Sequence, residues 1–185
     1  MYVTFYNNND PIDWRFIVAP AIPKPAFKLV SGGQLKWVQC DDVRNFPNEA
    51  LIGGFQNETV YIIRAFHAGA LTPGKYVPTK QNGYVAWTGY AHEKSTFEVL
   101  CGFDCMWVPS SHNNIPPGAV VGGYSQNQQR EKLYVGRAVH DGHIVPGKVQ
   151  AAYSVCFIPY NGLEIGKSHY EILVVPQANE PFHKP

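Results

Sequence analysis

Short runs rich in hydrophobic, β-branched and aromatic residues recur along this chain, which is typical of β-strands. Each run ends at Gly, Pro or Asn, and no window shows a sustained helical period. The pattern predicts strands near residues 36–39, 50–55, 59–67, 75–79, 83–88 and 96–101, and again near residues 106–109, 119–124, 132–140, 147–150, 152–158 and 169–175.

The two longest predicted strands, residues 59–67 and 132–140, are apolar on both faces and should therefore be covered on both sides. Each strand carries a single arginine in an otherwise apolar row. A buried guanidinium needs an acidic partner, because leaving it unpaired is costly. The acids that recur inside strands predict two structural ion pairs, formed within or between the two halves: Arg64 with Glu98, and Arg137 with Glu171.

The second half of the chain repeats the first. Residues 134–148 (YVGRAVHDGHIVPGK) match residues 61–75 (YIIRAFHAGALTPGK), with eight of the fifteen positions identical. The match extends to residues 47–55 against 116–124 and to residues 97–100 against 170–173, as well as to Trp37 against Trp107. The offset changes only across polar loops, where insertions are tolerated. The pattern therefore indicates a tandem duplication.

This duplication divides the chain into four parts. We expect an N-terminal β arm over residues 1–35, a first repeat over residues 36–102, a second repeat over residues 103–176 and a polar tail over residues 177–185. The 17 Gly and 15 Pro, together with many β-branched and aromatic residues, favour an all-β fold. The arm lies outside the duplication, and we interpret it as an extra hairpin or as an oligomerisation arm.

Composition excludes several classes of function. With 45% apolar residues and a formal net charge of +1, the chain is not typical of disordered proteins, and it has no charged field for nucleic acid or an anionic membrane. The first ten residues lack the basic and apolar regions of a signal peptide, and no segment approaches the roughly 18 apolar residues of a membrane helix. We therefore expect a cytoplasmic protein, with release or vesicle association left open.

The motifs of enzymes and metal sites are weak here. Residues 162–168 (GLEIGKS) have three residues between the glycines, where a phosphate-binding loop needs four. Cys101 and Cys105 are separated by an unusual spacing for zinc, and no second ligand pair follows them. We interpret the four cysteines as free thiols, expect no cofactor and no metal, and predict that the protein is not an enzyme.

Two basic side chains recur with a more informative context. Lys75 and Lys148 each follow Pro-Gly, which we interpret as a turn leading into a strand, a suitable place to present a donor to a ligand. A solvated loop lysine is the alternative. His67 and His140 also recur, and strand histidines of this kind are more often structural than ligand-binding.

Taken together, the repeated motifs resemble the DM-nine repeat family of invertebrate proteins. The motifs are the Trp-Val pair, the Gly-Gly-aromatic segment, the long Arg-Ala-x-His segment that ends in Pro-Gly-Lys, and the aromatic-Glu-x-Leu segment, over residues 36–175. The resemblance implies two tandem antiparallel repeats that share strands in a sandwich-like or prism-like arrangement. Family members include mannose-binding lectins that act in pattern recognition and innate immunity, commonly as dimers.

In such lectins the Pro-Gly-Lys lysine and an aspartate hold the sugar. The lysine maps onto Lys75 and Lys148, but the aspartate is replaced by Gln56 in one repeat and Ser125 in the other. Glu58 lies near Gln56 in sequence, whereas the second repeat offers no acid near Ser125, so we expect the first site to bind better. The resemblance implies glycan partners and a homodimer; the alternative is an intracellular interaction or scaffold protein built on the same repeats.

Overall fold

A computed structural model describes residues 34–176 of the chain. Regular structure in these residues consists of β-strands and short 3-10 helices, which confirms the all-β prediction. The predicted arm, apart from residues 34 and 35, and the polar tail lie outside the described residues. The domain boundaries therefore stay a prediction.

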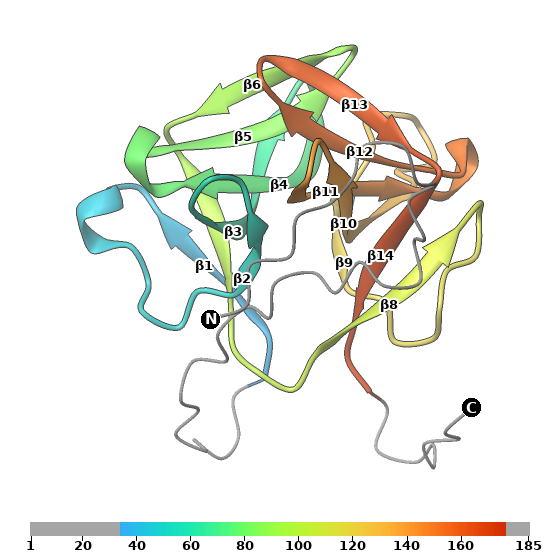
Figure 1. Cartoon of the computed structure of the whole chain (residues 1–185), viewed down its shortest axis with the longest axis horizontal. Helices are drawn as coiled ribbons and strands as arrows, with labels where there is room; N and C mark the ends of the chain where they lie inside the picture. The colour runs from blue at the N-terminus through green and yellow to red at the C-terminus, as the bar shows by residue number, and fades with distance from the viewer. Residues whose placement is uncertain (1–33, 177–185) are drawn as a thin grey trace, which may run out of the picture. The chain divides into compact units, whose positions relative to one another are not determined.

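The described strands follow one another in two similar series (Figure 1). The first series is β1 (Lys36–Cys40), η2 (Val43–Asn45), β2 (Ile52–Phe55), β3 (Thr59–His67), β4 (Ala70–Val77), η3 (Pro78–Lys80), β5 (Asn82–Trp87), β6 (Tyr90–Lys94) and β7 (Phe97–Cys101). The second series is β8 (Met106–Ser111), β9 (Val121–Tyr124), β10 (Lys132–His140), β11 (His143–Gln150), η4 (Ala151–Tyr153), β12 (Val155–Tyr160), β13 (Leu163–Lys167) and β14 (His169–Val174).

The long strands β3 and β10 have the predicted bounds, whereas the hairpin partners β6 and β13 were missed by the sequence pattern. Both are reached by two-residue turns in which both residues have positive φ, Thr88–Gly89 (47° and 85°) and Asn161–Gly162 (46° and 83°). This geometry matches the twist of a β-hairpin and turns the chain back onto the preceding strand. The hydrophobic pattern did not predict β6 and β13 because both contain several polar residues. They are strands because they pair with β5 and β12.

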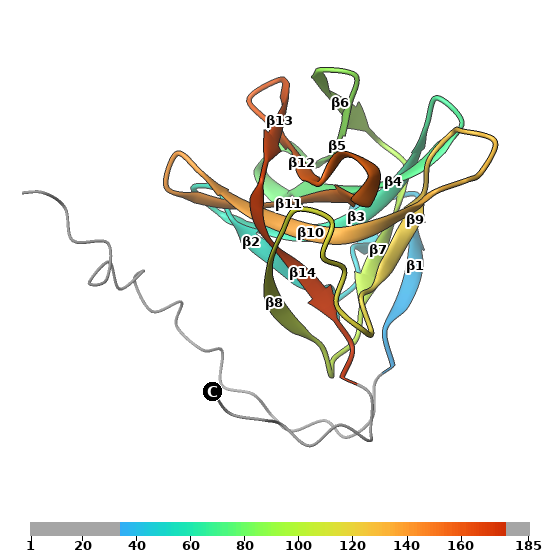
Figure 2. The same ribbon diagram turned by 90° about the vertical axis from the view of Figure 1, so that its right-hand side faces the viewer.

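Eight of the strands close into an antiparallel barrel. Its order is β3, β2, β11, β12, β13, β6, β5 and β4, and β4 pairs again with β3. The turns of the β5–β6 and β12–β13 hairpins lie side by side at the top of Figure 2 and are joined where Leu163 pairs with Tyr90. The barrel thus contains strands of both repeats, as the shared-strand expectation requires.

The repeats exchange strands at two places. Strand β2 pairs with β11 of the other repeat at Phe55 and Ile144, and β9 pairs with β4 at Tyr124 and Leu71. The duplicated Gly-Gly motif makes this contact possible. A Cβ at Gly54 would lie 2.0 Å from the carbonyl oxygen of Ile144, and one at Gly123 would lie 1.9 Å from that of Leu71. Only glycine allows backbones to approach so closely.

The core is built in three parts that mirror the duplication. One cluster belongs to the first repeat, one to the second, and a third joins the two. The joining cluster consists of buried residues at equivalent positions, Ile62 with Val135 and Leu100 with Leu173. Ile62 and Ile63 are both fully buried, so β3 is covered on both faces as predicted. Because these residues are buried between the two repeats, each repeat contributes to the stability of the other.

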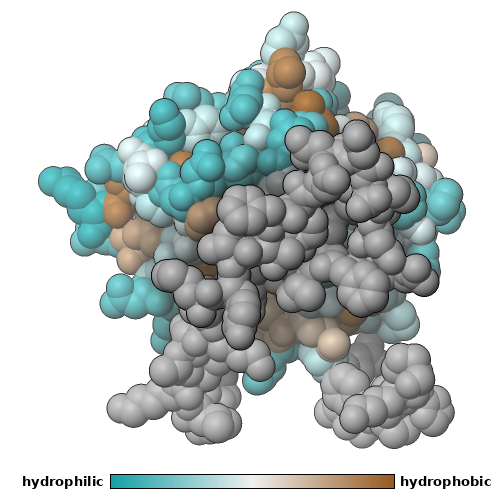
Figure 3. Space-filling view, viewed as in Figure 1, coloured by the Kyte–Doolittle hydropathy of each residue, from teal (hydrophilic) through white to brown (hydrophobic). Residues whose placement is uncertain are grey.

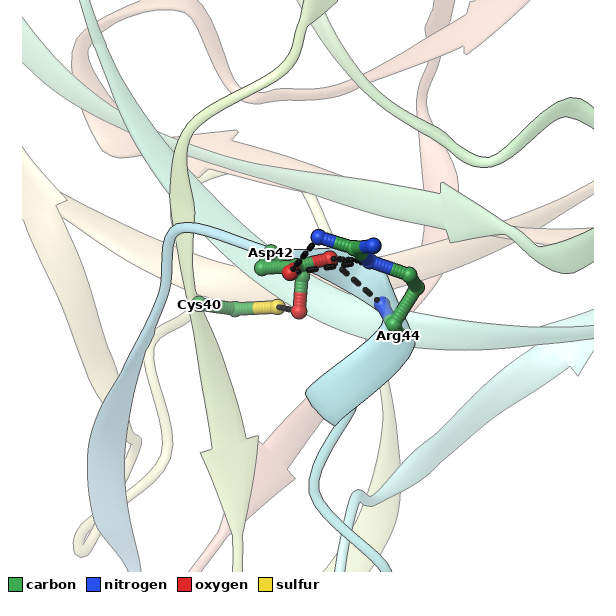
Figure 4. A network of polar contacts seen from close by, with 3 residues as sticks. All are labelled: Cys40, Asp42 and Arg44. Atoms are coloured by element: carbon green, nitrogen blue, oxygen red, sulfur yellow. Dashed lines mark hydrogen bonds and ion pairs between the residues drawn. The ribbon is translucent and has the colours of Figure 1, made fainter.

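A local network holds the loop after β1. Asp42 lies just before η2, and its carboxylate accepts a hydrogen bond from the backbone N–H of Arg44 at 3.0 Å (Figure 4). The Arg44 guanidinium returns to the same carboxylate at 2.7 Å, and the Cys40 thiol lies 3.7 Å from the Asp42 carbonyl oxygen. The side chain of Asp42 thereby caps the short helix and positions the chain for β2.

The surface is mixed in character. On the face in Figure 3, hydrophobic residues form separate patches among hydrophilic ones, one of them over β13. Exposed apolar residues include the equivalent pair Phe66 and Val139, at 64% and 62% exposure. The rows of β3 and β10 that contain Arg64 and Arg137 are therefore exposed at one end and not buried throughout. In residues 34–176 no helix is long and apolar enough to cross a membrane.

Candidate functional site

The Pro-Gly-Lys motifs lie inside strands, so the prediction of a turn there is wrong. Lys75 lies in the second half of β4, and Lys148 lies in the second half of β11. Strand β4 pairs with β9 at Leu71 and with β5 from Gly74 onward, so Pro73 stands where the neighbour changes and the ladder is interrupted. A Cβ at Gly74 would lie 2.1 Å from the carbonyl oxygen of Tyr84. In the motif, the proline thus lies where β4 changes its neighbouring strand, and the glycine allows the backbone of β5 to approach closely. The lysine that follows is buried.

Lys75 is almost fully buried, at 4% exposure, which excludes the solvated-loop alternative. Its ammonium donates a hydrogen bond to Oε1 of Gln56. The ring centroids of Tyr84 and Tyr160 lie 6.0 Å and 5.8 Å from its Nζ. Burial lowers the pKa of Lys75 to about 8, and no neighbouring acid offsets this effect among the described residues. We call the cleft around this lysine the first corner.

The first corner is an open cleft of about 540 Å³. Gln56 and Glu58 reach it from the turn after β2, whereas Asn161 and Gly162 reach it from the β12–β13 turn of the other repeat. Nε2 of Gln56 donates to Oδ1 of Asn161 at 3.5 Å, which links the two sides. Neither repeat alone supplies the complete site.

Glu58 does not replace the missing aspartate as a partner of Lys75. Its carboxylate accepts hydrogen bonds from the backbone N–H of Thr79, at 3.0 Å, and from the Thr79 hydroxyl. It thus holds the short helix η3 at the edge of the first corner. Glu131 has the equivalent role in the second repeat, where it accepts from the backbone N–H of Ala152 at 3.0 Å. The structure places Glu58 in the cleft wall, as a neighbour of the lysine site.

Lys148 occupies the equivalent place in the second repeat, and we call its cleft, of about 300 Å³, the second corner. It is also 4% exposed, and its Nζ lies 3.0 Å from Oε1 of Glu164. The same ammonium donates to the carbonyl oxygen of Ala86 at 2.7 Å, and lies 4.6 Å from the Trp87 ring centroid. Burial lowers the pKa of Lys148, and the Glu164 carboxylate opposes this effect.

The expectation that the second site has no carboxylate is therefore wrong. Glu164 comes from β13, a segment that the sequence pattern presented only as a failed phosphate-binding loop. Aligning residues 83–94 with residues 156–167 would have placed Glu164 opposite Ala91 of the first repeat. Ser125 lines the second corner, but its hydroxyl donates to Oδ1 of Asn127 at 2.7 Å rather than to a lysine partner.

The two predicted ion pairs form within the repeats. Nε of Arg64 lies 2.8 Å from the Glu98 carboxylate, and Nε of Arg137 lies 2.6 Å from that of Glu171. Each guanidinium also stacks on the repeated tryptophan, with its carbon 4.3 Å from the ring centroid of Trp37 or Trp107. The side chains are 16% to 35% exposed. These pairs are thus half-buried supports for the sheet and not part of either corner.

The recurring histidines and the cysteines pack against neighbouring side chains and lie outside the two corners. His67 packs on His92, with ring centroids 4.1 Å apart, and its Nδ1 lies 3.0 Å from Nζ of Lys94. His140 packs edge-on against Tyr160 at 4.7 Å. Cys40, Cys101 and Cys156 are buried and Cys105 is half-buried, all with free thiols. In residues 34–176 no group of three His, Cys, Asp or Glu side chains has metal-binding geometry.

Comparison with known proteins agrees with the duplicated architecture. The DM9 repeat model matches residues 55–167 and again residues 128–183, together more than half of the chain. A search of curated proteins found no match. The crystal structure of the nematode sperm cell motility protein MFP2B is similar, with a TM-score of 0.57 and 12% identity over 86% of this chain. The chain spans 50% of that protein, and the low identity makes this a likeness of fold alone.

Proposed function

This chain belongs to the DM9 repeat family, and we propose that it is a carbohydrate-binding protein whose two corners hold mannose-type sugars. The proposal assigns Lys75, Gln56 and Glu58 to the first corner, and Lys148 and Ser125 to the second. It describes a recognition protein rather than an enzyme. By the resemblance, its glycans lie on microbial or host surfaces and its role is in innate immunity. The absence of a signal-peptide pattern in the first ten residues is the basis for proposing a cytoplasmic location, with release or vesicle association left open.

The observation that carries the proposal is the buried lysine inside each open cleft. A sugar is recognised by hydrogen bonds to hydroxyl groups and by aromatic rings against its apolar face. Each corner combines a lysine donor, amide or hydroxyl groups and two aromatic rings. A cleft of about 540 Å³ also lies in the size range of small-molecule sites, which is roughly 300–1,000 Å³.

The first corner should bind the more tightly of the two. Lys75 uses one of its three N–H donors on Gln56, whereas Lys148 uses two, on Glu164 and Ala86. More donors thus remain for a ligand in the first corner. Two corners on one chain, or four in the expected homodimer, would raise the avidity for a glycan-coated surface.

The test is calorimetry with a mannose oligosaccharide and binding to a mannan-coated surface. Lys75→Ala should weaken binding more than Lys148→Ala, and the double variant should abolish it. Lys132→Ala, which removes an exposed lysine outside both corners, is the control and should bind like the parent. Binding by the double variant with parental affinity would place the sugar site elsewhere.

A second candidate is a non-lectin interaction or scaffold protein. The apolar residues Phe66 and Val139, exposed at equivalent positions of the two repeats, favour this reading because they could contact a protein partner. The fold likeness to a motility protein is compatible with it. A parent protein that binds no glycan on an array, while remaining folded, would favour this function over the first.

A further inference from the structure

The two corners are equivalent in backbone but differ in charge. The N–H of Ala91 donates to the carbonyl oxygen of Gly162 at 3.0 Å, and the N–H of Glu164 donates to that of Gly89 at 3.0 Å. Ala91 and Glu164 therefore occupy matching positions, one above each lysine-bearing strand. Glu164 neutralises Lys148 from this position, whereas the methyl group of Ala91 leaves Lys75 without that counter-ion.

No other described acid pairs with Lys75. Its hydrogen-bond partner, Gln56, is neutral. Of the two acids that line the first corner, Glu58 binds Thr79, and Glu93 accepts from the Tyr84 hydroxyl at 3.3 Å and from Asn82 at 3.2 Å. Within residues 34–176 no carboxylate oxygen lies within ion-pair distance of the Lys75 ammonium, while one lies 3.0 Å from that of Lys148.

A buried ammonium with a neutral partner is poorly compensated, because the low-polarity surroundings replace water without supplying an opposite charge. A ligand that brings a carboxylate into the cleft would form a charge-assisted hydrogen bond, which is roughly twice as strong as a neutral one. The exposed Lys80 also lines this cleft and adds positive charge. Glu93 is exposed, so water and salt screen its repulsion of an incoming anion.

We propose that the first corner selects an acidic sugar, such as a uronic acid, and that the second corner accepts only neutral sugars. This inference rests on the proposed function, since it names the sugar class of the same site. The preference comes from one position, Ala91 in the first repeat and Glu164 in the second. It divides the two sites of one chain between two classes of glycan.

The experiment compares two sugars that differ only at C6, methyl α-mannopyranoside and its uronate, methyl α-mannopyranosiduronate. Binding is followed by amide and indole chemical shifts in NMR titrations at pH 7. Resonances of Gln56 and Thr79 report on the first corner, and the Trp87 indole, which lies over Lys148, reports on the second. The parent should bind the uronate at the first corner about tenfold more tightly than the neutral sugar, an advantage of about 1.4 kcal/mol.

Exchange of the discriminating position sharpens the test. Ala91→Glu should remove the uronate preference of the first corner, whereas the uncharged control Ala91→Gln should retain it. Glu164→Ala should create uronate binding at the second corner, with Glu164→Gln as its closer-sized companion. Because the two exchanges act on different hairpins, one remains informative if the other variant fails to fold.

The outcomes separate this inference from the function on which it rests. Equal affinity of the first corner for both sugars, or binding of the neutral sugar alone, overturns the acidic-sugar inference and leaves the lectin function standing. Uronate binding that is unchanged in Ala91→Glu also overturns it. If neither sugar shifts any resonance of the folded parent, both the inference and the proposed function fail.

Discussion

Replacing Lys75 with methionine should stabilise the protein, although the change removes a hydrogen bond. Methionine has a similar length and would occupy the same space near the Tyr84 and Tyr160 rings, but it carries no charge. Burial lowers the pKa of Lys75 from 10.5 to about 8. Each pKa unit corresponds to about 1.36 kcal/mol, so holding the ammonium in this site costs the folded state about 3 kcal/mol at pH 7.

Part of this gain is offset by lost contacts. The hydrogen bond to Gln56 contributes on the order of 1 kcal/mol, and Gln56 is partly exposed, so water can replace its partner. The tyrosine rings lie near the limit of cation–π range and add little. The net expectation is that Lys75→Met raises the free energy of unfolding by about 1–2 kcal/mol at pH 7.

The same substitution at Lys148 should have the opposite sign. Lys148→Met leaves Glu164, whose side chain is 10% exposed, without its cation, although the Gly89 N–H still donates to it at 2.7 Å. Breaking a buried pair from one side typically costs about 3–5 kcal/mol, and the remaining hydrogen bond places the expected loss near the lower end. Two equivalent lysines in one chain thus provide each other's control.

The pH dependence follows from the lowered pKa. Below pH 8 Lys75 is charged in both the folded and the unfolded chain, so the full cost of burial is present. Between pH 8 and 10.5 the unfolded chain binds more protons than the folded one, and stability rises with pH. The advantage of Lys75→Met over the parent should therefore shrink as pH rises through this window.

Urea unfolding followed by tryptophan fluorescence, repeated from pH 7 to pH 10 on the parent and both variants, checks these expectations. Comparing differences between proteins cancels the titration of groups that they share. The reasoning is refuted if both variants are destabilised by similar amounts, or if the difference between Lys75→Met and the parent is the same at pH 7 and pH 10.

Three further outcomes are expected. Gly54→Ala should destabilise the protein by about 1–3 kcal/mol, because its Cβ would meet the Ile144 carbonyl oxygen at 2.0 Å; Gly166→Ala, with only a side chain at 3.1 Å, should cost far less in the same urea assay. Arg137→Met should cost about 2 kcal/mol, between an exposed and a fully buried ion pair, and parental stability would show that the Glu171 pair contributes nothing. Burial raises the pKa of the Cys40, Cys101 and Cys105 thiols, so thiol reagent at pH 8 should react slowly with the native protein and with four groups after denaturation without reductant; fewer than four would reveal a disulfide.

Much of the architecture could be predicted from the amino-acid sequence, because it depends on local spacing and on repetition. The apolar residues on both faces of β3 and β10 identify strands that are covered on both sides, and the repeated segments identify the duplication and the family. The pairing of Arg64 with Glu98 could also be anticipated, since one charge in an apolar row demands a partner and few acids recur. The sequence also shows that Lys75 and Lys148 occupy equivalent positions of the two repeats.

Only the tertiary structure decided how each corner is composed. Glu164 lies 16 residues after Lys148 and Ala91 lies 16 residues after Lys75, yet one lysine is neutralised and the other is not. The alanine and the glutamate stand at equivalent positions of the sequence, but only the folding back of the β5–β6 and β12–β13 hairpins brings them to the corners that contain Lys75 and Lys148. The inward direction of both lysines likewise follows from backbone crossings that Gly74 and Gly147 permit, contacts between segments of chain rather than properties of a segment.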